Sequence, residues 1–480
     1  MNILIANPPW PGEGYGARSN VRWPHRRGDK RLSFPIYLAY ASSLLKRSGF
    51  KVKAVDAVWE EWGISEFVLE AKKAKPDVIF LEVSTPSIMF DLETAESLHE
   101  EMPGATIVFG GPHASYFHER IIENYRFVDV CIRGEFEYTL KDICETVKKR
   151  KSLSEIKGIT FRNKMGNTVI NEERPLKTDI DDFPYPDRES FPIERYQQAF
   201  YAGKKTALVL SSRGCPFRCT YCLWPSTLTY RRYRRRDPKK VVDEIEHLIE
   251  KEGIDEVFFD DDEFVMDKKK VADICGEMIR RGISIKWQCM GRVDMVDSKT
   301  LGLMKRAGCY QIFYGFESGS EKILKSVKKG ITTEQTKKAV ELTKKAGIVC
   351  GGSFVLGSTY EDNNTANETI KFSRTLGADW VQFTLCAPFP GTPMYEEAKN
   401  LGLLEVDSWS DFDGSNGPIM RTKYLSREEL SGLQRKAYIS YYTAPRVIIT
   451  NLLSIRSLEQ ARRVIRGIKS VLSRVFYYKE

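Results

Sequence analysis

The stretch SSRGCPFRCTYC, from Ser211 to Cys222, decides the fold that we expect for this chain. It places Cys215, Cys219 and Cys222 at spacings of four and three residues. Three close thiolates are soft ligands that suit an iron–sulfur cluster, and they leave one corner of a four-iron cluster without a protein ligand. A structural zinc site normally takes four ligands, and none of the five histidines lies in a second ligand motif. We therefore predict an iron–sulfur cluster with one open iron, with zinc or unrelated thiols as the alternatives.

The rest of the chain places this motif in an ordinary globular protein. Because 480 residues are too many for one hydrophobic core, we expect two or three domains. Hydrophobic residues make up 42% of the chain and charged residues 29%, which excludes disordered and fibrous classes. Outside the cluster the cysteines are scattered singly, which is typical of a reducing compartment rather than of a disulfide framework.

We find no sequence sign of secretion or of a membrane span. The N-terminal MNILIANPPW has no basic segment before an apolar run. The longest apolar candidate, VIITNLLSI from Val447, falls well short of the ~20 residues that a spanning helix needs. We therefore expect a cytoplasmic protein.

Residues 1–140 alternate apolar runs with helical patterns. Continuous apolar strands between helices predict a parallel, doubly wound, Rossmann-like sheet, whose ligand should lie beyond the carboxyl ends of the strands. The expected strands are NILIA, KVKAVDA, DVIFLEVS, ATIVFGG and VDVCIRG, and the expected helices are IYLAYASSLLKRSG and MFDLETAESLHEEM.

Residues 141–198 are predicted to form a connector. It contains a basic helix that ends in VKKRKS and a small hairpin, GITFRNKMGNTVINE, with a Met-Gly-Asn turn. The three prolines of DDFPYPDRESFP then make a stiff, extended boundary.

Residues 199–400 alternate strands and helices again, at longer spacing. Six such units predict a partial, open (β/α)6 barrel of the TIM type, whose chemistry should lie at the carboxyl ends of the strands. The cysteine motif follows the first of these strands. The expected strands are TALVLSS, EVFFDDD, IKWQCMG, QIFYGFES, VCGGSFVLG and WVQFTLCAP.

Residues 401–480 are predicted to form a helical C-terminal subdomain without a chemical motif. Within it, apolar residues at helical spacing and interspersed arginines suggest a basic amphipathic helix over Leu458–Phe476. We expect this helix to pack against the barrel, with peripheral membrane contact as the alternative. The net charge is +9, and we interpret the run RRYRRRDPKK (Arg231–Lys240) as a solvated face, with an anionic substrate, a membrane or nucleic acid as alternatives.

The pattern Cys-x3-Cys-x-aromatic-Cys after a first barrel strand resembles the signature of radical S-adenosylmethionine enzymes. FFDDDEF (258–264), YGFESGS (314–320) and PFPGTPMY (388–395) are similar to further motifs of that family. GGSFVLGSTYED matches its fifth-strand motif only loosely, which leaves the adenine contacts open. Alone, DDDE is typical of a solvated turn or of a divalent-metal site.

The resemblance implies a 4Fe–4S cluster on the three cysteines, with the open iron chelated by the amino and carboxylate groups of S-adenosylmethionine. Reductive cleavage then gives a 5′-deoxyadenosyl radical that abstracts hydrogen from an unactivated carbon. The residues expected to contact S-adenosylmethionine are Tyr221, Asp261, Arg292, Glu317, Ser318 and Gly357.

The first 140 residues resemble the cobalamin-binding domain that precedes the barrel in one subclass of this family. The matching stretches are ANPPW, FPIYLAYASSLLKRSGFKVKAVDA, GGPHAS and IRGEFEYTL. The Asp-x-His-x-x-Gly motif, by which some cobalamin proteins supply a histidine to the lower face of cobalt, is absent. We therefore expect cobalt without a protein histidine beneath it, and His113 is the one residue that could act as such a ligand instead. The expected cobalamin contacts are Pro8, Ser84, Thr85, Gly110, Gly111, His113, Gly134 and Glu135.

The resemblance implies methylation of an unactivated carbon from methylcobalamin. The alternatives are a radical cyclase or oxidoreductase acting on a tetrapyrrole or lipid, and a non-catalytic, cobalamin- or redox-responsive binding module. Methylthiolation of tRNA would need three further cysteines near the N-terminus, where only Cys131 and Cys144 occur, so nucleic acid is not expected as a partner. The expected partners are a small-molecule, lipid or tetrapyrrole substrate and an electron donor such as flavodoxin or ferredoxin.

Overall fold

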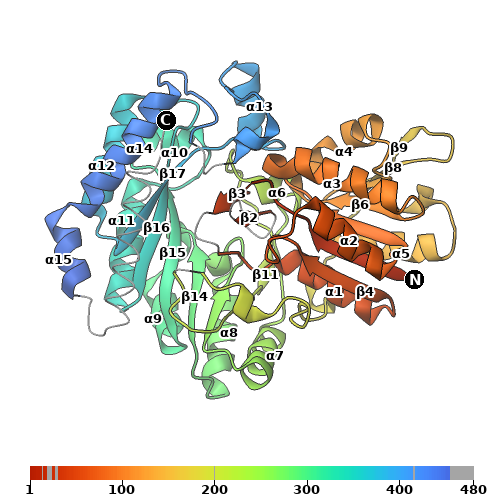
Figure 1. Ribbon diagram of the computed structural model, residues 1–480. Coiled ribbons are helices and arrows are strands. Elements are labelled where there is room, and N and C mark those ends of the chain that lie inside the picture. The colour runs from red at the N-terminus through yellow and green to blue at the C-terminus, as the bar shows by residue number, and fades with distance from the viewer. Residues whose placement is uncertain (13–14, 19–23, 28–30, 199, 414–416, 454–480) are drawn as a thin grey trace.

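The structure is a computed structural model that describes residues 1–12, 15–18, 24–27, 31–198, 200–413 and 417–453. Two sheets stand side by side, and the short elements Ser212–Arg213 and Leu223–Thr227 lie between them (Figure 1). In the described residues no helix is long and apolar enough to cross a membrane. The predicted helix Leu458–Phe476 lies outside the described residues.

The first sheet has the doubly wound order predicted for the N-terminal domain. Its first five strands are parallel, and chain order reverses between β1 and β5. In spatial order the strands are β4 (Lys51–Asp56), β1 (Asn2–Asn7), β5 (Val78–Glu82), β6 (Thr106–Gly110), β7 (Val130–Ile132), β8 (Ile159–Arg162) and β9 (Thr168–Ile170).

Helices cover both faces of this sheet, because the strands are apolar on both sides (Figure 1). Leu4 and Ile79 face one core, whereas Ile3 and Phe80 face the other. The helices are α1 (Ile36–Arg47), α2 (Ile64–Ala74), α3 (Ile88–Glu101), α4 (Pro112–Asn124) and α5 (Glu137–Lys148).

The hairpin predicted in the connector extends the first sheet. Strand β8 pairs antiparallel with β7, and β9 pairs antiparallel with β8. Further along the connector, Asp187 binds helix α1 through Ser42 at 2.5 Å and Lys46 at 2.8 Å. The connector is therefore fastened to the N-terminal domain along much of its length.

The second sheet confirms the partial barrel. Its six strands are parallel and follow chain order. They are β10 (Thr206–Val209), β13 (Glu256–Phe259), β14 (Lys286–Gly291), β15 (Cys309–Glu317), β16 (Val349–Leu356) and β17 (Trp380–Leu385). Its outer helices are α7 (Pro238–His247), α8 (Lys268–Arg280), α9 (Ser298–Arg306), α11 (Thr333–Lys345) and α12 (Asn363–Leu376).

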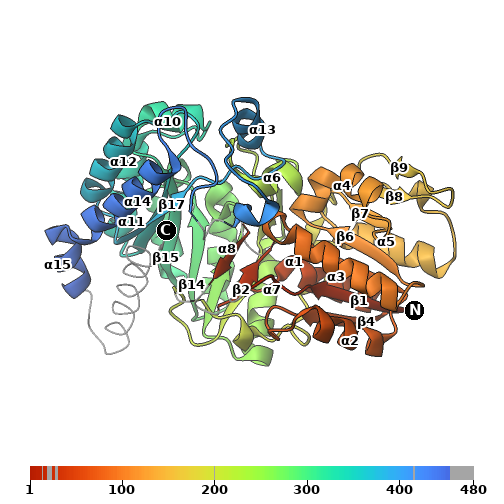
Figure 2. The same cartoon turned by 45° about the horizontal axis from the view of Figure 1, so that its top comes forward.

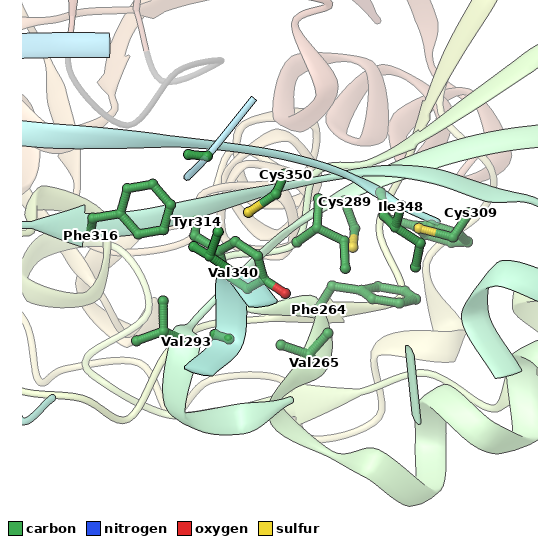
Figure 3. Packing of buried hydrophobic residues seen from close by; sticks show 14 of the residues in the cluster. Phe264, Val265, Cys289, Val293, Cys309, Tyr314, Phe316, Val340, Ile348 and Cys350 are labelled. Atoms are coloured by element: carbon green, nitrogen blue, oxygen red, sulfur yellow. The ribbon is translucent and has the colours of Figure 1, made fainter. Parts of the chain in front are cut away.

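The barrel core explains several of the scattered cysteines. Cys289, Cys309 and Cys350 lie among Phe264 and Tyr314 in one buried apolar cluster (Figure 3). None of the ten cysteines forms a disulfide bond. Here the thiols act as small apolar side chains.

Shorter elements complete the chain. Two small antiparallel ladders join β2 (Tyr15–Ala17) to β3 (His25–Arg27) and β11 (Ser212–Arg213) to β12 (Arg234–Arg235). The remaining helices are α6 (Leu223–Thr227), α10 (Glu321–Ser326), α13 (Pro393–Asn400), α14 (Arg427–Tyr442) and α15 (Pro445–Leu453). The predicted helical C-terminal segment thus begins at Arg427, because the described residues 401–413 and 417–426 are mostly irregular.

Helix α14 covers the last strand of the open barrel (Figure 2). The Tyr438 hydroxyl accepts a hydrogen bond from the Phe383 amide, and Gln434 donates one to the Phe383 carbonyl. The Tyr442 hydroxyl donates a further one to the carbonyl of Val381. These three side chains take the place of a seventh strand.

Candidate active site

The three cysteines lie on one loop between β11 and α6, at the carboxyl end of the barrel. Cys219 is buried, whereas Cys215 and Cys222 are partly exposed. Burial, with the nearby charge of Asp262, raises the pKa of the Cys215 thiol to about 12. A metal ion would offset this cost, since thiols bind metals as thiolates.

Backbone hydrogen bonds hold this loop on both sides. Gly214 has a positive φ of 85° and donates from its amide to Asp262 at 3.0 Å. Thr220 donates to the carbonyl of Val327 and accepts from the amide of Met394, both at 3.0 Å. A side chain at position 214 would strike the Arg232 backbone, which explains the glycine before the first cysteine.

The acidic run after β13 forms a buried support for the loop rather than a solvated turn. Asp261 is fully buried and accepts from the amides of Ser211 and Ser212, both at 2.7 Å. Glu263 accepts from the amide of Arg292 at 3.0 Å. The contact predicted between Asp261 and S-adenosylmethionine stays a prediction, since these protein partners already engage its carboxylate.

The donor set fits a cluster better than one ion. Among the described residues, no three His, Cys, Asp or Glu side chains are grouped to hold a single metal ion. In a four-iron cluster each thiolate binds a different iron, so the three sulfurs stand further apart than around one ion. Cys215, Cys219 and Cys222 on one supported loop would each bind a different iron.

Two cations lie beside the cysteine loop. The guanidinium carbon of Arg292 stands 3.6 Å from the centre of the Phe217 ring, and Arg292 donates to the Lys329 carbonyl at 2.9 Å. Burial opposes the charge of Arg292, but Asp294 and then Cys219 raise the pKa of its guanidinium. Lys329 likewise has a raised pKa, because Glu317 and Cys219 outweigh its burial. These cations offset the negative charge of thiolates.

Glu317 ends β15 beside the cysteine loop, where its backbone has a positive φ of 62°. Its carboxylate accepts hydrogen bonds from Lys329, at 2.7 Å, and from the Tyr221 hydroxyl. Burial, followed by the charge of Glu317 and the thiols of Cys219 and Cys222, raises the pKa of Tyr221 well above its usual value. The structure thus brings Tyr221, Arg292 and Glu317 together around the cluster loop.

The other two residues expected to contact S-adenosylmethionine lie further along the barrel. Ser318 is fully buried, and its Oγ lies 2.9 Å from Oγ1 of Thr369 in α12. Gly357 follows β16 with a positive φ of 90°. Directly after it, the hydroxyls of Ser358 and Thr359 are buried and make no hydrogen bond in the described part of the chain. A polar ligand at this strand end would supply their missing partners.

The N-terminal sheet offers a second ligand site at its topological switch point. In doubly wound sheets, ligands lie outside the carboxyl ends of the strands where chain order reverses. That point lies between β1 and β5, so Pro8, Ser84 and Thr85 border it. These residues therefore stand where a doubly wound sheet receives a cofactor.

A buried polar network, missed in the sequence, supports this edge. Arg18 donates to Asn7 at 2.6 Å, to the Pro8 carbonyl at 2.8 Å and to Asp91 at 2.6 Å. Asp91 also accepts from Ser87 at 2.6 Å. The network joins the ends of β1 and β5, and its partners lie too far apart in sequence for a local pattern to reveal them.

His113 is buried at the same edge. Its Nδ1 lies 3.1 Å from Oγ1 of Thr85, and its ring packs against Phe117 at 4.8 Å and Trp409 at 5.5 Å. Burial lowers the pKa of His113 to about 3, so the imidazole is neutral. These contacts favour a packing and hydrogen-bonding role over cobalt ligation.

The remaining expected cobalamin residues lie after β6 and β7. Gly111 begins α4 with a φ of 110°, and a Cβ at Gly110 or Gly111 would strike Phe80 or Val83. Gly134 and Glu135 follow β7, two strands from the switch point. Both also contact the barrel: Gly134, whose amide donates to Ser115 at 3.0 Å, lies against Tyr230, and Glu135 pairs with Arg234 at 2.5 Å.

The basic run after α6 is not simply a solvated face. Arg234 and Arg236 are buried, and Arg236 binds Glu244. Arg231 donates to the carbonyl of Phe217 in the cysteine loop. The interpretation of this run as a solvated face is therefore wrong for these three arginines, since they meet acceptors inside the protein.

Comparison with known proteins agrees with this two-site arrangement. The Radical SAM superfamily matches residues 209–372, and the B12 binding domain matches residues 31–144. The chain is 34% identical over 446 residues to an uncharacterized methyltransferase of Pyrococcus horikoshii, which covers 92% of this chain and 94% of that one. It is 29% identical to the anaerobic magnesium-protoporphyrin IX monomethyl ester cyclase of Cereibacter sphaeroides, over 92% of this chain and 70% of the cyclase.

The same fold occurs in a solved structure. The cobalamin-dependent S-adenosylmethionine radical enzyme OxsB, with aqua-cobalamin and S-adenosylmethionine bound, superposes with a TM-score of 0.74. The superposition covers 99% of this chain and 72% of OxsB, at 18% identity. This likeness concerns the fold.

The chain therefore belongs to the radical S-adenosylmethionine enzymes that carry a B12-binding domain. More particularly, it is a cobalamin-dependent radical enzyme, with a 4Fe–4S cluster, S-adenosylmethionine and cobalamin as cofactors. As a member of this family it requires a reductant and a substrate. A non-catalytic binding module is accordingly set aside.

Proposed function

We propose that this enzyme methylates an unactivated carbon of a small-molecule, lipid or tetrapyrrole substrate, with cobalamin as the methyl carrier. The observation that carries the proposal is the contact between the barrel and the N-terminal domain beside the cysteine loop. Arg213 in β11, two residues before Cys215, binds Glu137 at the start of α5 at 2.6 Å. The P. horikoshii relative, named as a methyltransferase, matches both domains and supports this reading.

When bound, the reduced cluster supplies the electron that cleaves S-adenosylmethionine to a 5′-deoxyadenosyl radical, and cobalamin supplies the methyl group. Cys215, Cys219 and Cys222 would hold the cluster, and Pro8 and Thr85 would border cobalamin.

Charge and shielding come from neighbouring side chains. Lys329 and Arg292 lower the cost of negative charge beside Cys219. Glu317, which accepts from Lys329 at 2.7 Å, would present its carboxylate to the ammonium group of S-adenosylmethionine. Trp409 covers His113 at the cobalamin edge and helps to exclude water there.

Radical cyclisation without methyl transfer is the second candidate. The C. sphaeroides cyclase matches 92% of this chain, so the same two domains serve an enzyme named for ring closure. The physiological electron donor in either case would be a flavodoxin or a ferredoxin.

The test is to purify the protein without oxygen, load it with iron, sulfide and cobalamin, reduce it and add S-adenosylmethionine. We expect 5′-deoxyadenosine, S-adenosylhomocysteine and methylcobalamin. Cys219→Ala should lose 5′-deoxyadenosine and bound iron, whereas Cys386→Ala, which changes a buried cysteine outside the loop, should keep both. Deoxyadenosine without methylcobalamin would instead support the cyclase.

A further inference from the structure

Two arginines beside the cysteine loop bind two glutamates of the cobalamin domain. Arg213 in β11 and Arg234 in β12 are direct partners in one small ladder, and Arg213 precedes Cys215 by two positions. Glu135 and Glu137 follow β7 at the carboxyl edge of the N-terminal sheet. We call these four residues the interdomain clamp.

The contacts in the clamp are close and directional. Arg213 binds Glu137 at 2.6 Å, and its distance to Glu135 is 3.7 Å. Arg234 donates to the Glu135 carboxylate from both terminal nitrogens, at 2.5 and 2.8 Å. A planar guanidinium bound through two nitrogens fixes direction as well as distance, which a lysine ammonium does not.

The clamp is shielded from water. The side chain of Arg213 is 2% exposed and that of Glu137 is 1% exposed. The Arg213 guanidinium lies 4.2 Å from the ring centre of Phe183 and 4.7 Å from that of Tyr40.

A gain in stability does not by itself explain why these charges are buried together. A buried ion pair contributes little net stability compared with an apolar pair, because two charges must leave water, whereas it can specify one arrangement of its neighbours. Here the arrangement that it specifies joins the first residues of the cluster loop to the end of β7.

We propose that the interdomain clamp is a set of positioning residues that fixes the cluster loop relative to the cobalamin domain, and so sets the distance between the cluster and cobalt. This rests on the proposed function in one respect, since methyl transfer and radical formation must serve one substrate. The clamp itself need not touch substrate or cofactor.

The experiment measures that distance in the fully loaded protein. The reduced cluster and cob(II)alamin each carry an unpaired electron, so pulsed electron paramagnetic resonance reports their separation and its spread. Glu137→Gln removes one negative charge from the clamp. Arg234→Lys keeps the positive charge but loses the bidentate contact with Glu135. Arg235→Gln is the matched control, because Arg235 is the neighbour in β12 whose side chain is 52% exposed and pairs with Asp267 at the surface.

We expect a narrow distance distribution in the wild type and in Arg235→Gln, and a shifted or broadened one in Glu137→Gln and Arg234→Lys at full iron and cobalamin loading. Methylcobalamin formation should fall about tenfold or more in the same variants, because small misplacements of reacting groups are costly. Unchanged distributions in loaded Arg234→Lys would overturn the clamp. Lack of methylcobalamin in the wild type would instead count against the proposed function, and the distance would still decide the clamp.

Discussion

Nζ of Lys329 lies 2.7 Å from Oε1 of Glu317, and both side chains are about nine-tenths buried beside the cysteine loop. The pair presents one charge of each sign at the carboxyl end of β15. The amino-acid end of S-adenosylmethionine also carries one charge of each sign, an ammonium and a carboxylate. This complementarity makes the pair a natural receptor for that end of the cosubstrate.

Lys329→Met should therefore weaken S-adenosylmethionine binding. We expect the dissociation constant to rise about tenfold, or about 1.4 kcal/mol, because the carboxylate of the cosubstrate then loses its cationic partner. Calorimetric titration of the cluster-loaded protein measures this. Lys268→Met is the control, because Lys268 pairs with Asp297 at the surface; equal affinities in all three proteins would contradict the assignment.

Glu361 should make stability depend on pH. Burial raises its pKa from 4.5 to about 7, so the folded chain binds this proton more tightly than the unfolded chain does. Its contribution is favourable below pH 4.5 and is lost as the pH rises from 4.5 to 7. Glu361→Gln should thus gain stability relative to wild type between pH 5 and pH 8, by up to roughly 3 kcal/mol.

Urea unfolding of both proteins at the two pH values measures this difference. Glu189→Gln is a suitable control, because its side chain is 93% exposed. A gap between wild type and Glu361→Gln that stays constant with pH would argue against the raised pKa.

Gly111→Ala should destabilise the cobalamin domain. Its φ of 110° disfavours a side chain, and an added Cβ would lie 2.6 Å from the carbonyl oxygen of Val83. We expect a loss of about 1–3 kcal/mol in urea unfolding. Gly104→Ala meets open space and should cost far less; equal losses would mean that the turn before α4 tolerates a side chain.

His113→Ala should leave the cobalt coordination unchanged. The imidazole lies against Phe117 and Trp409 and bonds to Thr85, which accounts for its burial without a metal. The electron paramagnetic resonance spectrum of bound cob(II)alamin tests this. A nitrogen splitting that is present in wild type and in His118→Ala but lost in His113→Ala would show that the histidine is a ligand.

Most of the fold can be predicted from the apolar runs that mark its strands. The apolar runs of both sheets are continuous, so all six barrel strands and the five parallel strands of the first sheet could be located from the sequence. The ladder of β11 and β12 has only two residues on each side and leaves no periodic signal. The sequence pattern does not predict helix α4. Its N-cap and first residue are Gly111 and Pro112, and these two residue types are typical of a loop.

The site was predictable only where chemistry is local. Cys215, Cys219 and Cys222 share one short motif, whereas Arg213 and Glu137 are 76 positions apart and meet only in the folded chain. Lys329 resembles any surface lysine in sequence, and only burial beside Glu317 distinguishes it. Long-range pairing of charges is therefore the part of this site that no local pattern reveals.

The side chains of helix α14 that contact β17 protect the edge of the barrel sheet from pairing with another chain. An uncovered outer strand offers a row of free amides and carbonyls on which another chain can grow, and this is a common route to aggregation. Here Tyr438, Gln434 and Tyr442 occupy backbone groups of Phe383 and Val381 that such a chain would need. At its β17 edge the open barrel is thus protected from serving as a template for other strands.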